Sequence, residues 1–266
     1  MSATASEAEL LAAVEQSPRA VAAHDRTGWV GLFTRDGRIE DPVGSRPHVG
    51  TAAIERFYDT FIAPNSIVFD VEHDVVCGMS VFRDLAIEIT MAGVALRVPM
   101  HLRYDLVRSA ETLEIAELRA HWELPVMVGQ LLASGLPGLR AAATLGPRLV
   151  GNQGIGGTVG FARGFVRVSA AGKRLATDVL AAAGRGSVGA VRNGLSPGAV
   201  VEWPVGNAIT PEEFVARAAG VRIGKPISAG RFVTATVEST AGRGVAELEV
   251  ASGGRRVAMV RIFAPD

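Results

Sequence analysis

Cysteine and lysine are scarce in this sequence. Of its 266 residues, only Cys77 is a cysteine, and only Lys173 and Lys225 are lysines. A single cysteine cannot form an intramolecular disulfide or a cysteine zinc cluster, so a fold held together by disulfides is excluded. We therefore expect a protein of a reducing compartment, the cytoplasm. Because lysine is scarce, arginine carries nearly all of the positive charge.

A long apolar run is also absent. The longest uncharged stretch, residues 124–139, is interrupted by glycine and proline, for example at Gly129 and Pro137. It is shorter than the ~20 apolar residues that a membrane-spanning helix needs. Residues 1–6 are small and polar, and glutamates follow at once, so we expect neither a signal peptide nor a membrane span.

Acidic residues are nearly missing from the middle of the chain. Residues 125–200 contain only Asp178 and carry a net charge of +7, whereas residues 1–124 carry −8 and residues 201–266 carry +1. A basic middle segment can contact anionic lipid, nucleic acid or the acidic first part of the same chain. Aromatic residues that could stack on bases are few there, so we expect no nucleic acid partner and keep a membrane surface as an alternative.

Patterns for metals and nucleotide cofactors are missing as well. The five histidines show no HxH or HExxH spacing, which argues against a metal site. The glycine-rich stretch 154–160 has no clear strand before it and lacks the lysine of a P-loop. We expect no metal and no cofactor.

The first 124 residues have the pattern of an α+β domain. Ser6 and Glu9 form a capping box for a helix that runs to about Ala23, and a second helix is predicted over residues 27–33. Thr51 is expected to cap a third helix. Four strand-like runs follow, near residues 67–77, 80–92, 94–108 and 112–123. Helices followed by long antiparallel strands predict a curved sheet wrapped on helices.

An internal repeat is the most informative feature of the chain. The sequence EDPVGS at residues 40–45 recurs as EWPVGN at residues 202–207, and Thr210 then opens another capped helix. Strand-like runs follow again, near residues 220–228, 231–240, 243–251 and 255–264. We predict two copies of one fold, residues 1–124 and 171–266, joined by an apolar, basic, helical linker of residues 125–170.

Three sequence features together resemble the ketosteroid isomerase group of the SnoaL-like, NTF2-like superfamily. They are the EDPVGS motif, the downstream GTAAIERFY at residues 50–58, and Trp122 on the last predicted strand. The resemblance covers about residues 7–123, and residues 173–264 more weakly. It implies two cone-shaped NTF2-like domains, or cystatin-like α+β rolls, with a curved antiparallel sheet on helices. It also implies an apolar small-molecule ligand.

The resemblance implies a proton shuttle, in which a carboxylate removes a proton next to a ketone and hydrogen-bond donors hold the enolate oxygen. Asp41 falls on the position of this general base. Tyr58 and Trp122 fall on pocket-lining positions, and Phe33 is a further expected ligand contact. The two donor positions fall on Ser17 and Met100, so the usual donors are absent. Met100 instead favours an apolar pocket.

The predicted function is therefore an isomerase- or polyketide-cyclase-like enzyme with Asp41 as the general base. A non-catalytic small-molecule-binding protein is one alternative, because the usual donors are absent. A scaffold whose middle segment docks on a membrane surface or a partner is another.

An epoxide-hydrolase- or cyclase-like enzyme is a further alternative, which requires an arginine between two aspartates. The residue types are available in Arg97, Arg103, Asp70, Asp84 and Asp105. If Met100 and Tyr104 point into the cavity, however, the alternation of side chains along a strand directs Arg97, Arg103 and Asp105 outward.

In the second copy, Trp203 occupies the position of Asp41. An indole cannot accept a proton at neutral pH, so we expect the second copy to be catalytically silent and to replace a partner subunit. We expect an intramolecular pseudo-dimer in which the sheets of residues 67–123 and 220–264 cover each other, with residues 125–170 as a strap.

Overall fold

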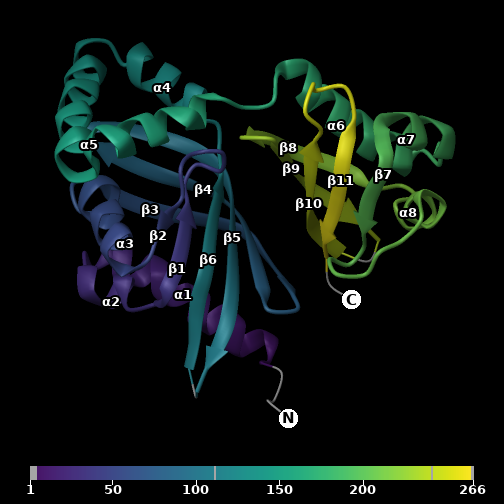
Figure 1. The fold of residues 1–266 in the computed structure, drawn as a ribbon, viewed down its shortest axis with the longest axis horizontal. Coiled ribbons are helices and arrows are strands. Elements are labelled where there is room, and N and C mark those ends of the chain that lie inside the picture. Colours follow the sequence, from purple (N-terminus) through teal and green to yellow (C-terminus); the bar gives the residue numbers. More distant parts are fainter. Residues whose placement is uncertain (1–4, 111, 241, 265–266) are drawn as a thin grey trace. The chain divides into compact units, whose positions relative to one another are not determined.

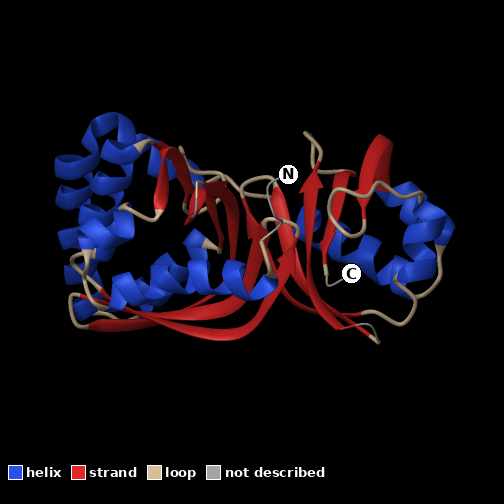
Figure 2. Cartoon of the chain, turned by 90° about the horizontal axis from the view of Figure 1, so that it is seen from below, coloured by secondary structure: helices blue, strands red, loops and turns tan. Residues whose placement is uncertain are grey.

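The computed structural model describes residues 5–110, 112–240 and 242–264. The chain divides into two compact units (Figure 1). The first comprises Met1–Asp74 and Met79–Val166, and the second comprises Val75–Gly78 and Arg167–Asp266. In each unit the strands form one curved sheet with helices against it, as Figure 2 shows. The predicted α+β class is confirmed.

The first unit contains a six-stranded sheet in the order β2-β1-β6-β5-β4-β3. Strand β1 pairs parallel with β6, whereas β4–β5 and β5–β6 are antiparallel, so the sheet is mixed and not purely antiparallel as predicted. The elements up to the end of the sheet are α1 (Glu7–Ala22), α2 (Arg26–Val30), β1 (Phe33–Glu40), β2 (His48–Val49), α3 (Thr51–Phe57), the π-helical turn η1 (Tyr58–Ile62), β3 (Ser66–Cys77), β4 (Ser80–Met91), β5 (Val94–Ser109) and β6 (Thr112–His121).

Local sequence signals explain where these helices begin. The capping box of α1 is formed as predicted: the Glu9 amide donates to Ser6 Oγ, and the Ser6 amide donates to the Glu9 carboxylate. The predicted capping role of Thr51 is wrong. Gly50 is the N-cap of α3 with a φ of 81°, a conformation that glycine adopts without steric cost, and Thr51 is the first helical residue.

Two further helices, α4 (Leu124–Ala133) and α5 (Leu136–Ala162), complete the first unit together with the 3₁₀ turn η2 (Arg163–Phe165). Helix α4 packs on β5, and α5 packs on α3 and η1. The first unit therefore extends to Val166, past the boundary at residue 124 that the sequence suggested. Buried apolar side chains on α4, such as Met127 and Leu131, hold the helix on the sheet. Among the described residues, no helix is long and apolar enough to cross a membrane.

The second unit repeats the topology of the first. Its sheet has the order β7-β11-β10-β9-β8, and β7 pairs parallel with β11 as β1 does with β6. A capping box at Thr210 and Glu213 opens α8 as predicted. The elements are α6 (Ala170–Gly184), α7 (Val188–Gly194), β7 (Leu195–Glu202), α8 (Pro211–Arg217), β8 (Arg222–Ala229), β9 (Phe232–Ser239), β10 (Gly242–Val250) and β11 (Val257–Phe263).

The repeated sequence motif makes the same turn in both units. In the first unit the Val43 amide donates to the Ala120 carbonyl over 2.8 Å, and the Val205 amide donates to the Ile262 carbonyl over 3.0 Å in the second. Both X–Pro bonds of the motif are cis. The two amide hydrogen bonds attach the turn to β6 in the first unit and to β11 in the second.

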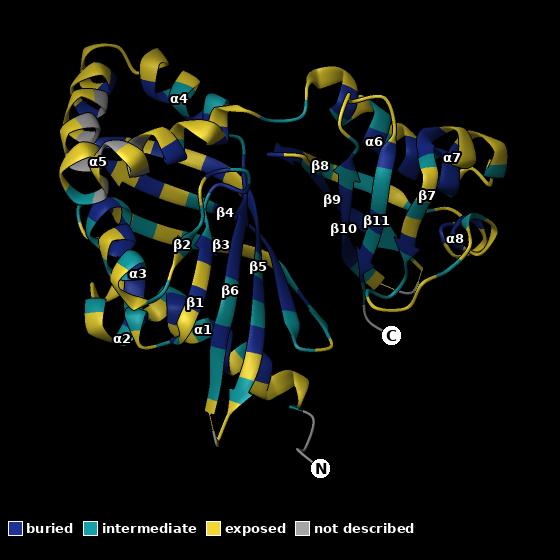
Figure 3. Cartoon of the chain, in the orientation of Figure 1, coloured by how far each residue is buried: buried dark blue, intermediate teal, exposed yellow. Residues whose placement is uncertain are grey.

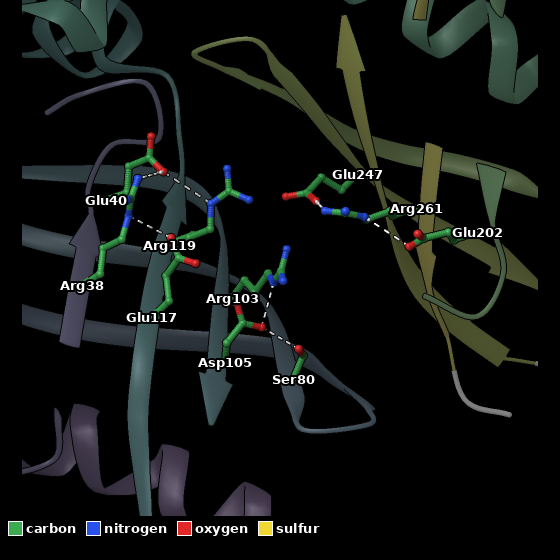
Figure 4. Close-up of polar contacts among 10 residues, drawn as sticks. All are labelled: Arg38, Glu40, Ser80, Arg103, Asp105, Glu117, Arg119, Glu202, Glu247 and Arg261. Atoms are coloured by element: carbon green, nitrogen blue, oxygen red, sulfur yellow. Dashed lines mark hydrogen bonds and ion pairs between the residues drawn. The ribbon is translucent and has the colours of Figure 1, made fainter. Parts of the chain in front are cut away.

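A glutamate before each turn makes matching polar contacts. Glu40 accepts a hydrogen bond from the Gly44 amide and pairs with Arg119 at 3.5 Å. Glu202 accepts from the Gly206 amide and pairs with Arg261 at 3.2 Å. Figure 4 shows the two ion pairs. The second unit thus repeats the first in the order of its strands and in these individual contacts.

Candidate functional site

A cavity opens inside the first unit, between its helices and its sheet. It has a volume of about 910 Å³, solvent at its mouth included. The side chains that line it come from α1 and α2, from α3 and η1, from β3 to β6, and from α4 and α5. Most are aliphatic or aromatic. The polar groups among them are Ser17, Asp41, Asn65, Tyr104 and the indole nitrogens.

Asp41 and Trp122 meet at one edge of the sheet. Asp41 follows the end of β1, and Trp122 follows the end of β6. Because β1 and β6 are parallel neighbours, their carboxyl ends lie side by side. Trp122 Nε1 donates a hydrogen bond to Asp41 Oδ1 over 2.6 Å. This bond holds one carboxylate oxygen and leaves the other available at the cavity.

The cavity changes the acidity of Asp41. Burial among apolar groups raises the pKa of its carboxyl from 3.8 to about 6, and the hydrogen bond from Trp122 opposes part of that rise. At neutral pH the group is still largely ionised. It is therefore a stronger base than an ordinary carboxylate and is present in the form that accepts a proton.

Ser17, Trp29 and Tyr104 form a second polar group in the wall. Trp29 Nε1 donates to Ser17 Oγ over 3.1 Å, and the Ser17 side chain is hydrogen-bonded to Tyr104. Since Ser17 Oγ already accepts from Trp29, its own proton is the one it can offer to the tyrosine oxygen. Burial raises the pKa of Tyr104, and the hydrogen bond from Ser17 acts in the opposite direction. The Tyr104 hydroxyl therefore stays protonated and can donate its own proton.

Asn65 adds a polar atom that lacks a partner. Its Nδ2 donates to the Phe61 carbonyl over 2.8 Å, and a carbonyl only accepts, so the orientation of the amide is determined. Its Oδ1 is buried and makes no hydrogen bond within the described part of the chain. Nothing in the sequence pattern indicates this residue.

The structure brings together four of the six residues predicted for the site. Ser17, Asp41, Met100 and Trp122 all line the cavity. Tyr104, which the sequence did not assign to the site, lines it as well, and the alternation of Val98, Met100, Leu102 and Tyr104 along β5 could have indicated this.

The other two predicted residues, Tyr58 and Phe33, are not among the lining residues. Both pack on Trp29, with ring centroids 5.6 Å and 5.0 Å from that of the indole. The hydroxyl of Tyr58 is buried and has no hydrogen-bond partner among the described residues. The structure thus places Tyr58 and Phe33 in the core behind the cavity wall.

The arginine and aspartate side chains considered for epoxide chemistry lie elsewhere. Arg97 pairs with Asp70 and Glu88, and Arg103 pairs with Asp105. None of these residues lines the cavity. Asp84 is buried beside His101, 3.4 Å away, and is not a lining residue either. Within the described lining, Asp41 is the one carboxylate and no arginine accompanies it.

Residues 9–94 match the family model of the nuclear transport factor 2 (NTF2) domain. Among solved structures, the chain is 30% identical to the Δ5-3-ketosteroid isomerase from a Mycobacterium species. The match covers 44% of the present chain and 95% of the isomerase chain, with a TM-score of 0.40. It is 29% identical to RV0760c from Mycobacterium tuberculosis in complex with estradiol-17β-hemisuccinate, with coverage of 44% and 95% and a TM-score of 0.40. It is 26% identical to SalBIII, an epoxide hydrolase/cyclase-like enzyme of pyran ring formation in salinomycin, with coverage of 45% and 94% and a TM-score of 0.38.

Each of these structures spans less than half of the present chain, about the length of one unit. The family-model match lies inside the first unit, whose helices and curved mixed sheet have the arrangement that the sequence resemblance implied. The chain belongs to the NTF2-like superfamily.

Proposed function

We propose that the first unit is an isomerase- or cyclase-like enzyme that transfers a proton on an apolar carbonyl compound of steroid or polyketide type, with Asp41 as the general base. The observation that carries the proposal is a single carboxylate, with a pKa of about 6, in the wall of an otherwise largely apolar cavity. An apolar wall with few polar groups suits a multi-ring ligand, and the raised pKa suits a base that works near neutral pH.

In the proposed reaction, Asp41 removes a proton from the carbon next to the ligand's carbonyl group. The electron pair of the broken C–H bond moves into an enolate, and the carbonyl oxygen gains negative charge. The protonated carboxyl then returns the proton to another carbon of the same conjugated system, so no cofactor takes part. Trp122 orients the carboxylate through its bond to Oδ1 and leaves Oδ2 to carry the proton.

Tyr104 is the proposed donor to the enolate oxygen. The usual donor positions of this family fall on Ser17 and Met100, of which methionine cannot donate a proton. Ser17, which is bonded to Trp29 and Tyr104, positions the tyrosine hydroxyl in the wall of the same cavity. Removing one such donor typically reduces a rate by about 10²–10³-fold.

A 5-ene-3-ketosteroid tests the proposal, because isomerisation produces a conjugated enone whose absorbance can be followed. We expect slow turnover, since Tyr104 alone replaces two donors. Asp41→Asn should abolish it, and Tyr104→Phe should reduce it about 10²-fold or more. Tyr58→Phe is the matched control, because that hydroxyl does not line the cavity, and it should leave the rate unchanged. Turnover that survives Asp41→Asn would refute the role of Asp41.

A non-catalytic binding protein is the second candidate, favoured by the apolar Met100 at a donor position. Equilibrium binding separates the two functions. If the cavity only binds, Asp41→Asn should bind an apolar ketone at least as well as the wild type, and neither protein should convert it. Conversion by the wild type would exclude this candidate.

A further inference from the structure

Exposed apolar side chains are concentrated on the two helices that close the first unit. Of the thirteen large hydrophobic residues that are exposed in the described chain, eight fall between residues 126 and 166. Figure 3 shows exposed positions along α4 and α5. An exposed cluster of this kind marks a surface that contacts a partner, whereas single exposed hydrophobic residues scattered over a surface do not.

The first half of α5 presents these side chains as one stripe. Leu136, Leu139, Ala143, Pro147 and Val150 recur at intervals of three or four residues, and all five are exposed. At 3.6 residues per turn they fall within roughly 100° of the helix circumference. Leu136 is 72% exposed, and Leu139 and Val150 are 52% and 50% exposed. A helix of a globular protein normally turns such a stripe toward its own core. We call these five residues the α5 stripe.

The segment of the chain that carries the α5 stripe contains charged residues of one sign. No acidic residue occurs between Glu123 and Asp178. Arg140 lies within one turn of the stripe's leucines and is exposed. Arg163 is also exposed, but it follows the bend of α5 at Gly154, where the backbone is not helical, and so it does not flank the stripe. An apolar stripe on a helical segment that contains arginine and no acidic residue has the composition of helices that lie in the interface of an anionic membrane. Such an arginine strengthens binding to anionic lipid by about fivefold.

We propose that the α5 stripe binds the surface of an anionic lipid bilayer and that Arg140 contacts the lipid headgroups. The part of α5 before the bend at Gly154 lies in the plane of the interface, and its apolar side chains enter the boundary of the acyl chains. An acidic protein surface would satisfy Arg140 but would leave Leu136, Leu139 and Val150 without an apolar environment. The bilayer accommodates both.

The proposal has a consequence that rests on the proposed function. Helices α4 and α5 also supply Met127 and Phe161 to the cavity wall, and Phe161 stacks on Phe61 with ring centroids 5.3 Å apart. The α5 stripe therefore lies between two residues that line the cavity, one on α4 and one beyond the bend at Gly154. Apolar ketones dissolve in bilayers, so a chain bound there is in contact with a phase in which its proposed ligand is concentrated.

Flotation of the full chain with lipid vesicles tests the proposal without reference to catalysis. Vesicles of phosphatidylcholine with about a third phosphatidylglycerol should carry the wild type upward at low salt, and phosphatidylcholine alone should carry much less. The double variant Leu136→Gln/Leu139→Gln should bind at least about tenfold more weakly, because two exposed leucines lose their apolar contact with lipid. Arg140→Gln should weaken binding to the anionic vesicles by roughly fivefold.

Two matched controls protect the interpretation. Val68→Gln/Val71→Gln replaces two exposed valines on β3, and Arg35→Gln replaces an exposed arginine on β1. Both should bind vesicles like the wild type, and circular dichroism should show that every variant is folded. The proposal is overturned if the wild type does not float with anionic vesicles, or if the leucine variant floats as well as the wild type. Self-association that the leucine variant abolishes, without vesicle binding, would show that a second copy of this chain covers the stripe.

Discussion

Replacing Asp41 by asparagine should stabilise the protein, and the gain should depend on pH. Burial raises the pKa of Asp41 from 3.8 to about 6 in the folded chain. A carboxyl that binds its proton more tightly when folded loses stability as pH rises through the interval between these two values. This difference between the two pKa values lowers the free energy of unfolding by about 3 kcal/mol once the pH is above the pKa of the folded state. Asparagine has no charge to bury, and its carbonyl oxygen can still accept the hydrogen bond from Trp122.

The measurement is the free energy of unfolding in urea, followed by circular dichroism and tryptophan fluorescence between pH 4 and pH 8. The difference between Asp41→Asn and the wild type should be small near pH 4, where both side chains are neutral. It should grow toward about 3 kcal/mol at pH 7 as the wild type takes on its buried charge. Asp36→Asn is the control, because Asp36 is exposed on β1, directly before this site.

The free energies of unfolding of Asp41→Asn and the wild type must be compared at the same pH, because the titration of His48 changes the stability of both proteins. Its effect has the opposite pH dependence to that of Asp41. Burial, with the positive charges of Arg56 and Arg46, lowers the pKa of His48 from 6.5 to about 4. A base whose pKa is lowered by folding loses stability as pH falls through that interval. The two effects offset each other in the wild type. A constant difference between Asp41→Asn and the wild type from pH 4 to pH 8, or a variant that is less stable at pH 7, would refute the account of a buried charge.

Three further predictions concern the site and the repeat. His48→Gln should remove the loss of stability on acidification from pH 6.5 to pH 4, worth up to about 3 kcal/mol, and an unchanged acid profile in urea denaturation would contradict the burial of His48. Trp122→Phe removes the donor to Asp41 Oδ1, so the pKa of Asp41 should rise further, by about one to two units, in an NMR titration of the carboxyl or on the acid limb of the activity profile. Calorimetric titration with a ketosteroid should give one site per chain, because Trp203 occupies the position of Asp41 in the second unit, and two equivalent sites would show that the second copy also binds.

Several features of this protein could be predicted from local sequence. The capping boxes at Ser6 and Thr210 locate two helix starts, since a hydroxyl and a glutamate three residues apart satisfy the free amides of a first turn wherever they occur. Turn residues and the alternation of apolar side chains locate the long strands. The repeated motif at residues 40–45 and 202–207 indicates two copies, because the same contacts need the same residues.

Other features depend on packing between distant segments. The π-helical turn η1 begins at Tyr58, where the Ala63 amide donates to the Tyr58 carbonyl, five residues earlier. The tyrosine packs on Trp29, away from the cavity that the sequence resemblance had suggested for it. A change of helical pitch over one turn has no sequence pattern of its own, so the direction of this side chain could not be predicted.

The sequence by itself determined the α+β class, the repeat and the candidate base Asp41, because each depends on neighbouring residues or on a contiguous motif. Only the tertiary structure decided that Tyr104 is hydrogen-bonded to Ser17 and that Phe161, from the segment expected to be a linker, closes the cavity. These contacts join residues tens of positions apart in the sequence. Their geometry is set by how the helices pack on the curved sheet, and no local pattern records it.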